Sequence, residues 1–230
     1  MKIMTMEQFL KNPSGSYSAS FARRDLIIAN MEDRFAKLLS KKKNEFKLLV
    51  FRGNNKNEFV FYLKVPSEEI PNLYYDVVLQ FIPTDMKCLS NPSLRNYALN
   101  VFSNSPNFHF TYAYWYNKDE IIIKQLKDKV SQTALTTEPV VKNAEGIYGF
   151  EKSVYFALLY LKYNNLDKKF TANSFVQENL SFNKIKPMVK SCNAKMIEYT
   201  AAKKKYQVDE KEKKKAVKKV IKKKNNKISF

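Results

Sequence analysis

Glycine is rare in this sequence: only Gly15, Gly53, Gly146 and Gly149 occur among 230 residues. Loops that cradle phosphate groups need several glycines, because their backbone N–H groups must approach the ligand closely. The scarcity of glycine therefore argues against a P-loop nucleotide-binding protein and against a dinucleotide-binding fold.

Residues that bind metals or form disulfides are equally few. The chain has one histidine, His109, and two cysteines, Cys88 and Cys192, which lie far apart and outside any Cys-x-x-Cys pattern. A structural zinc site needs three or four such ligands, so the composition argues strongly against one. One disulfide is possible, but reduced thiols are the default for two isolated cysteines. We expect His109 to be a packing residue. A catalytic Cys192–His109 dyad has no support in the sequence. No cofactor is expected.

Long apolar runs are absent. The longest, Val154–Leu161, is far shorter than the roughly 20 residues that a membrane-spanning helix needs. The N-terminal residues contain no apolar run of signal-peptide length. We therefore expect no membrane span, and a protein that is intracellular or is assembled inside a cell.

Positive charge is abundant, with a formal net charge of +19, and it is unevenly distributed. Residues 203–227 contain 13 lysines against three acidic residues, a net charge of +10, which leaves +9 for the rest of the chain. Such a field favours nucleic acid, an anionic membrane or an acidic protein surface as a partner. Only five of the 41 basic residues are arginines, which weighs against bidentate recognition of bases or phosphates. The simplest division is a folded body, 1–202, and a basic tail, 203–230.

The basic tail allows two interpretations. If it is helical, Ala216, Val217, Val220 and Ile221 share one face, as in a short basic amphipathic helix that lies on a polyanion, a membrane or a partner groove. Alternatively, the lysines are solvated and the tail is disordered until it meets a polyanion, while part of the lysine content reflects AT-rich coding. In both interpretations, the residues predicted to bind the polyanion are Lys213, Lys214, Lys215, Lys218, Lys219, Lys222, Lys223 and Lys224.

Hydrophobic periodicity predicts an α+β fold with a small, mainly antiparallel sheet packed with helices, followed by the lysine-rich C-terminal tail. The residues Thr5–Gln8 have the spacing of a capping box that begins a short helix. Further helices are predicted over 21–41, 93–102, 120–130 and 150–163, and strands over 46–51, 59–65, 73–82 and 108–116, with an extended loop over 136–149.

The strand predicted over 108–116 is the most aromatic part of the chain. In a strand, alternate side chains share a face, so the aromatic residues of this segment would form one row. The segment contains no lysine or arginine, which weighs against a platform that stacks nucleic-acid bases. We expect Phe108 and Phe110 to lie in the core. Rings with a polar atom suit protein interfaces, and the predicted interface residues are Tyr112, Tyr114, Trp115 and Tyr116.

A metal-dependent nuclease is the main enzymatic alternative. Such sites hold a divalent cation between acidic residues while a lysine supports the attacking water. Asp76 together with Asp85-Met86-Lys87 has roughly this spacing, and Glu45-Phe46-Lys47 opens a predicted strand. Because about one residue in six is lysine, several such acid-x-Lys triplets are expected by chance. The sequence therefore favours a protein that is not an enzyme.

The segment from Ser105 to Lys162 resembles virion structural proteins of tailed bacteriophages with AT-rich genomes, through Ser105–Glu120, Ser131–Thr136 and Gly149–Lys162. The resemblance covers about a quarter of the chain and carries no catalytic pattern. It implies a non-enzymatic part of a particle, such as a head–tail connection, neck or tail-completion protein or a DNA-proximal capsid component.

The expected function is therefore a virion structural or assembly protein, located in the virion and, during assembly, in the host cytoplasm. Its expected partners are other virion proteins in a homo- or hetero-oligomer, with possible DNA contact through the tail. The main alternative is a free nucleic-acid-binding phage protein.

Overall fold

The computed structural model contains a four-stranded antiparallel sheet with the strand order β1-β2-β3-β4. It describes residues 4–11, 21–55, 57–84, 93–139, 151–168, 170 and 172–225. The strands are β1 (Lys47–Arg52), β2 (Phe59–Pro66), β3 (Tyr74–Ile82) and β4 (Ala98–Ser103). The α-helices are α1 (Met6–Lys11), α2 (Phe21–Lys42), α4 (Ala113–Lys118), α5 (Gln132–Thr136), α6 (Lys152–Tyr163), α7 (Ala172–Phe175), α8 (Phe182–Ile185) and α9 (Cys192–Asn225). The predicted α+β class is confirmed.

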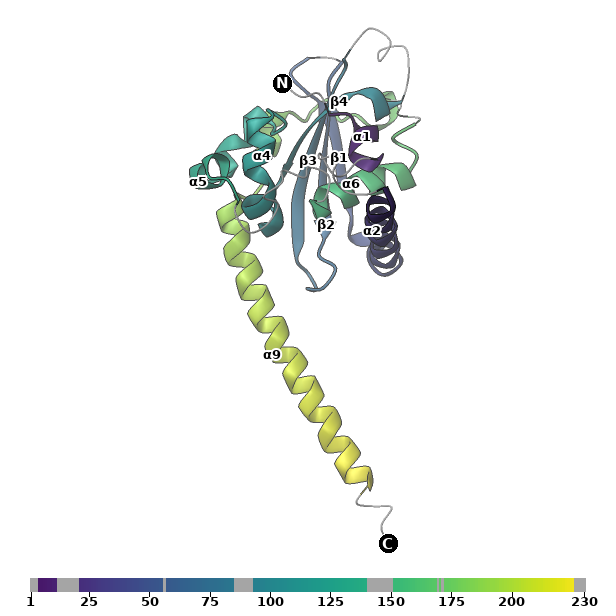
Figure 1. Cartoon of the computed structure of the whole chain (residues 1–230), viewed down its shortest axis with the longest axis vertical. Helices are drawn as coiled ribbons and strands as arrows, with labels where there is room; N and C mark the ends of the chain where they lie inside the picture. Colours follow the sequence, from purple (N-terminus) through teal and green to yellow (C-terminus); the bar gives the residue numbers. More distant parts are fainter. Residues whose placement is uncertain are drawn as a thin grey trace.

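Helices cover both faces of the sheet. In Figure 1, α1, α2 and α6 lie on one side of the strands, and α4 and α5 lie on the other. On the α6 face, the Oγ atom of Ser103 in β4 lies 2.8 Å from that of Ser153 in α6. On the opposite face, the rings of Phe102 and Phe108 are 5.8 Å apart. This double cover explains why β2 and β3 are almost continuously apolar, since both of their faces are buried.

Short backbone contacts cover the two edge strands. At the β1 edge, Val176 forms a parallel bridge with Val50. At the β4 edge, Ile122 forms a parallel bridge with Val101, and Thr5 forms an antiparallel bridge with Ala98. Exposed strand edges are templates for aggregation, so these bridges protect the sheet.

Several elements agree with the sequence prediction. The capping box at the start of α1 is confirmed: Thr5 N–H donates to Gln8 Oε1 at 2.8 Å, and Gln8 N–H donates to Thr5 Oγ1 at 3.3 Å. Helices α2 and α6 and strands β1, β2 and β3 occupy the predicted segments within one or two residues at each end. The predicted loop over 136–149 falls mostly outside the described residues.

The strand predicted over 108–116 is wrong, because this segment is helical. A π-helical turn, η3 (Phe108–Tyr112), continues directly into α4. Phe108, Tyr112 and Tyr116 are four residues apart and are all buried on one face of the helix. Every second residue of the segment is aromatic, so the same pattern also fits a period of four. Phe110, predicted as a core residue, is 62% exposed.

Two predicted helices are also wrong. Residues 93–102 form a short 3-10 turn, η2 (Leu94–Asn96), and then β4, because pairing with β3 overrides the local helical preference. Residues 120–130 first run along the β4 edge at Ile121–Ile123 and then form the 3-10 helix η4 (Lys124–Lys129). Asp119, the residue just before this predicted helix, ends α4.

Helix α9 carries the described part of the basic tail. It begins at Cys192 and crosses the predicted boundary at 202/203 without interruption. With a rise of 1.5 Å per residue, its 34 residues span about 50 Å. Figure 1 shows α9 projecting away from the sheet and its helices. Among the helices described here, none is long and apolar enough to cross a membrane.

Candidate functional site

The first turns of α9 attach this helix to the body. The thiol of Cys192 is buried and donates to the carbonyl oxygen of Ser103 at 3.6 Å. Glu198 accepts hydrogen bonds from the ammonium groups of Lys190 at 2.8 Å and Lys195 at 2.9 Å. Burial would raise the pKa of Glu198, but these hydrogen bonds hold it below its usual range. The attachment is therefore made by about two turns of helix, from Cys192 to Glu198, and the remainder extends outward.

The rest of α9 is a solvent-facing basic rod. From residue 196 to residue 215, the last with a described side chain, no residue is buried, and Ile197 and Val208 are 73% and 53% exposed. Of the lysines predicted to bind a polyanion, Lys213, Lys214 and Lys215 are exposed on this rod. The side chains of Lys218, Lys219, Lys222, Lys223 and Lys224 lie outside the described part of the structure. The same holds for the apolar residues predicted to form the opposite face: Ala216, Val217, Val220 and Ile221.

The aromatic segment divides into a buried half and an accessible half. Tyr112 and Tyr116 are buried, with their ring centroids 5.8 Å apart, so their predicted role at a protein interface does not fit this structure. They fill the core because they share the inward face of the helix with Phe108. Three rings of the segment remain accessible, and together with the exposed Lys118 we call them the aromatic surface: Phe110, Tyr114, Trp115 and Lys118.

The accessible rings are held together by contacts within the aromatic surface. Tyr114 and Trp115 pack edge to face with centroids 5.0 Å apart. The ammonium nitrogen of Lys118 lies 5.0 Å from the Trp115 ring centroid and 5.8 Å from that of Tyr114. A cation over two aromatic faces stabilises their orientation. Two of the four predicted interface residues, Tyr114 and Trp115, therefore remain candidates.

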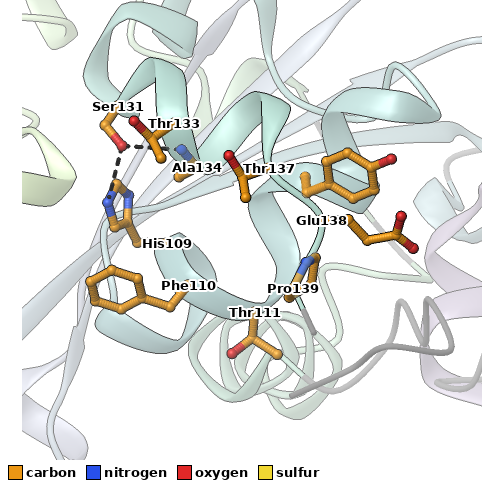
Figure 2. Close-up of a pocket in the computed structure, with 10 residues that line it drawn as sticks. His109, Phe110, Thr111, Ser131, Thr133, Ala134, Thr137, Glu138 and Pro139 are labelled. Carbon is orange, nitrogen blue, oxygen red and sulfur yellow. Dashed lines mark hydrogen bonds between the residues drawn. The ribbon is translucent and has the colours of Figure 1, made fainter. Parts of the chain in front are cut away.

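A cavity of about 510 Å³ lies beside the aromatic surface (Figure 2). One wall comes from η3 and α4, and the other comes from α5 and its flanking residues. The lining residues are His109, Phe110, Thr111, Tyr114, Ser131, Thr133, Ala134, Thr137, Glu138 and Pro139. A π-helical turn in such a wall is noteworthy because these turns often occur at functional sites.

His109 is the most buried titratable residue among those that line the cavity. Its Nε2 lies 3.3 Å from Ser131 Oγ, which also accepts a hydrogen bond from Ala134 N–H at 3.3 Å (Figure 2). Its Nδ1 is buried and has no hydrogen-bond partner among the residues that the structure describes. Burial lowers the pKa of His109, which favours the neutral imidazole. His109 is buried, as expected of a packing residue. Its Nδ1, however, makes no hydrogen bond to any described residue.

In the described part of the chain, no carboxylate joins Ser131 and His109 to complete a hydrolytic triad. In such sites a carboxylate orients the imidazole through the nitrogen that does not face the serine. Here no described residue pairs with that nitrogen, Nδ1, and Ser131 caps α5 through its hydroxyl. The arrangement is suited to binding a ligand, because both polar groups face a mainly apolar cavity.

Asp76, the central residue of the nuclease alternative, is buried and serves the fold. Its carboxylate accepts hydrogen bonds from Tyr62 O–H at 2.8 Å, Asn104 Nδ2 at 2.7 Å and Lys190 N–H at 3.1 Å. These contacts join β2, β3, the end of β4 and the segment that leads into α9. Asp85, with Met86 and Lys87, lies outside the described residues. Within the described ranges, no group of three histidine, cysteine or acidic residues is placed to hold a metal ion.

The buried thiol of Cys192 is expected to be inert in the folded chain. Burial raises the pKa of this thiol to about 12, so the nucleophilic thiolate is scarce near neutral pH. In a Cys88→Ser variant, we expect Ellman's reagent to modify Cys192 on the order of a thousandfold more slowly in native protein than in guanidinium. Equal rates in the two conditions would show that the base of α9 opens freely.

Comparisons with protein-family models, curated proteins and solved structures found no match to this chain. Its function therefore has to be argued from its own residues.

Proposed function

We propose that this chain is a non-enzymatic virion structural or assembly protein of a tailed phage that works by binding other macromolecules. In this proposal, α9 binds a polyanion, either DNA or an acidic protein surface, and the aromatic surface contacts protein neighbours.

The observation that carries the proposal is the combination of charge and shape in α9. Its described part extends into solvent, and every described lysine from Lys203 to Lys215 is exposed. A helix that is polar on all sides has no core of its own to pack against, so it is suited to bridging between molecules. Lysine-rich helices attract phosphate backbones without reading their sequence, which fits contact with packaged DNA.

The aromatic surface supports the second half of the proposal. Phe110, Tyr114 and Trp115 are accessible on one helical segment, and aromatic rings are enriched at the centres of protein interfaces. This surface and α9 belong to different elements, so in this proposal each makes its own contact.

The free nucleic-acid-binding protein is the second candidate, since α9 supports it equally well. The nuclease is weaker, because the three hydrogen bonds to Asp76 already occupy its carboxylate. The two leading candidates differ in oligomeric state and in their association with particles.

Native mass spectrometry and sedimentation of the full-length chain test the proposal. With fractions from a phage whose genome encodes the chain, we expect co-sedimentation with particles and a mass above that of the monomer. A Phe110→Ala, Trp115→Ala variant should lose about tenfold in particle association. The control Leu26→Ala, which alters an exposed side chain on α2, should behave like the wild type. A chain that stays monomeric and never sediments with particles would contradict the assembly role.

A further inference from the structure

The cavity between η3 and α5 has the size and lining of a ligand site. Its volume of about 510 Å³ falls within the range of roughly 300–1,000 Å³ that is usual for small-molecule sites. Phe110, Ala134 and Pro139 supply apolar surface (Figure 2). The ring of Tyr114 adds to it. Phe110 is 62% exposed beside the cavity. Keeping this large apolar ring in water costs free energy, and packing a ligand ring against it would remove that cost.

The hydrogen bonds of His109 are incomplete in a way that points to a polar group on the ligand. A neutral imidazole has one nitrogen that donates and one that accepts. If Ser131 O–H donates to Nε2, Nδ1 carries the proton and lacks an acceptor. If Nε2 donates to Ser131, Nδ1 is an acceptor that lacks a donor. In either tautomer, one capacity of a residue that is 95% buried is unused, which costs free energy unless a ligand satisfies it.

The charge of the lining indicates a neutral ligand. Among the lining residues that the structure describes, none is a lysine or arginine, although the chain as a whole carries +19. Glu138 is the only charged residue in this described part of the lining, and its carboxylate disfavours an anion.

We propose that the cavity beside His109 is a binding site for a neutral aromatic ligand that carries a hydroxyl group, in the simplest form a phenol. The ring packs against Phe110 and Tyr114, and the hydroxyl pairs with Nδ1 of His109 after a small rotation of the imidazole toward the cavity. A hydroxyl is suited to either tautomer, because it both donates and accepts. This site is independent of the binding role proposed for α9.

Two unique residues make the site directly observable. His109 is the only histidine of the chain, so its ring nitrogens give one assignable set of ¹⁵N signals that also report the tautomer. Trp115 is the only tryptophan and contacts Tyr114 in the cavity wall, so its fluorescence provides a second readout. We expect titration with p-cresol to shift the Nδ1 signal and to change the Trp115 emission. Toluene, which has the same ring without the hydroxyl, should bind about fivefold more weakly and leave Nδ1 unchanged.

Matched variants separate the cavity from the remaining surface. Phe110→Ala should weaken p-cresol binding about tenfold without unfolding the protein, because this ring is mostly exposed. Phe175→Ala, at a phenylalanine on α7 that is 41% exposed, should leave binding unchanged. Unchanged Nδ1 signals with p-cresol, equal affinity for p-cresol and toluene, or equal losses in the two variants would each overturn the proposal.

N-acetyltyrosinamide distinguishes two sources of the phenol group. The cavity is larger than a phenol ring, and Thr133, Thr137 and Glu138 can pair with peptide amides. Binding tighter than that of p-cresol would identify a tyrosine side chain of a partner as the ligand. Weaker binding, with the Nδ1 shift by p-cresol retained, would identify a free phenolic molecule.

Discussion

Removal of residues 203–230 is expected to lower the affinity for duplex DNA about a hundredfold at moderate salt while leaving the melting temperature nearly unchanged. The segment carries much of the positive charge, so the affinity for DNA depends on it. None of its described side chains is buried, so the stability of the core does not depend on it. If α9 contacts about five phosphates, the slope of log K against log salt should become less steep by about 4.5. Fluorescence anisotropy over a salt series and thermal denaturation measure the two effects.

A triple substitution keeps the helix and tests the charge alone. Replacing Lys213, Lys214 and Lys215 with glutamine should give part of the loss in DNA affinity. The same change at three exposed lysines of the body, Lys41, Lys47 and Lys64, serves as the matched control and should cost much less. Equal losses would show that binding depends on net charge without a role for α9, and a collapse of the melting temperature on truncation would make the tail part of the fold.

Substitution Asp76→Ala is expected to lower the free energy of unfolding by about 3–5 kcal/mol. It removes the shared acceptor of Tyr62, Asn104 and the Lys190 backbone, and leaves three donors unsatisfied in or beside the core. Urea denaturation followed by circular dichroism measures the change.

The control for this prediction is Asp33→Ala. Asp33 is an exposed residue of α2 that pairs with Lys37 at 2.7 Å, and its loss should cost no more than about 0.5 kcal/mol. If Asp76→Ala kept wild-type stability but abolished a Mg²⁺-dependent cleavage of plasmid DNA by the purified protein, Asp76 would be catalytic and the assembly proposal would fail.

The elements that could be predicted from sequence are those with an unambiguous local period. In α2, Met31, Phe35, Leu38 and Leu39 recur at helical spacing and are all buried. Strands β1 and β2 are separated by a polar turn that contains Gly53, and both lie where the pattern places them. Such segments bury one face or pair with the next strand along the chain. The spacing of nearby residues is therefore enough to identify them as helix or strand.

The errors arise where local pattern and tertiary contact compete. The aromatic residues of 108–116 fit periods of two and of four, and the choice of a helix follows from packing Phe108 against Phe102 and Tyr116. Residues 98–103 become a strand because β3 offers a pairing edge. Neither outcome follows from local periodicity.

The sequence by itself determined the α+β class, the concentration of positive charge near the C-terminus and the extent of the most periodic helices and strands, because composition and short-range spacing express these properties directly. Only the tertiary structure decided that Tyr112 and Tyr116 are core residues, that Asp76 supports the fold, and that His109 and Ser131 meet at one cavity. These three outcomes depend on which distant segments pack together. That packing is determined by burial of apolar surface and strand pairing over the whole chain.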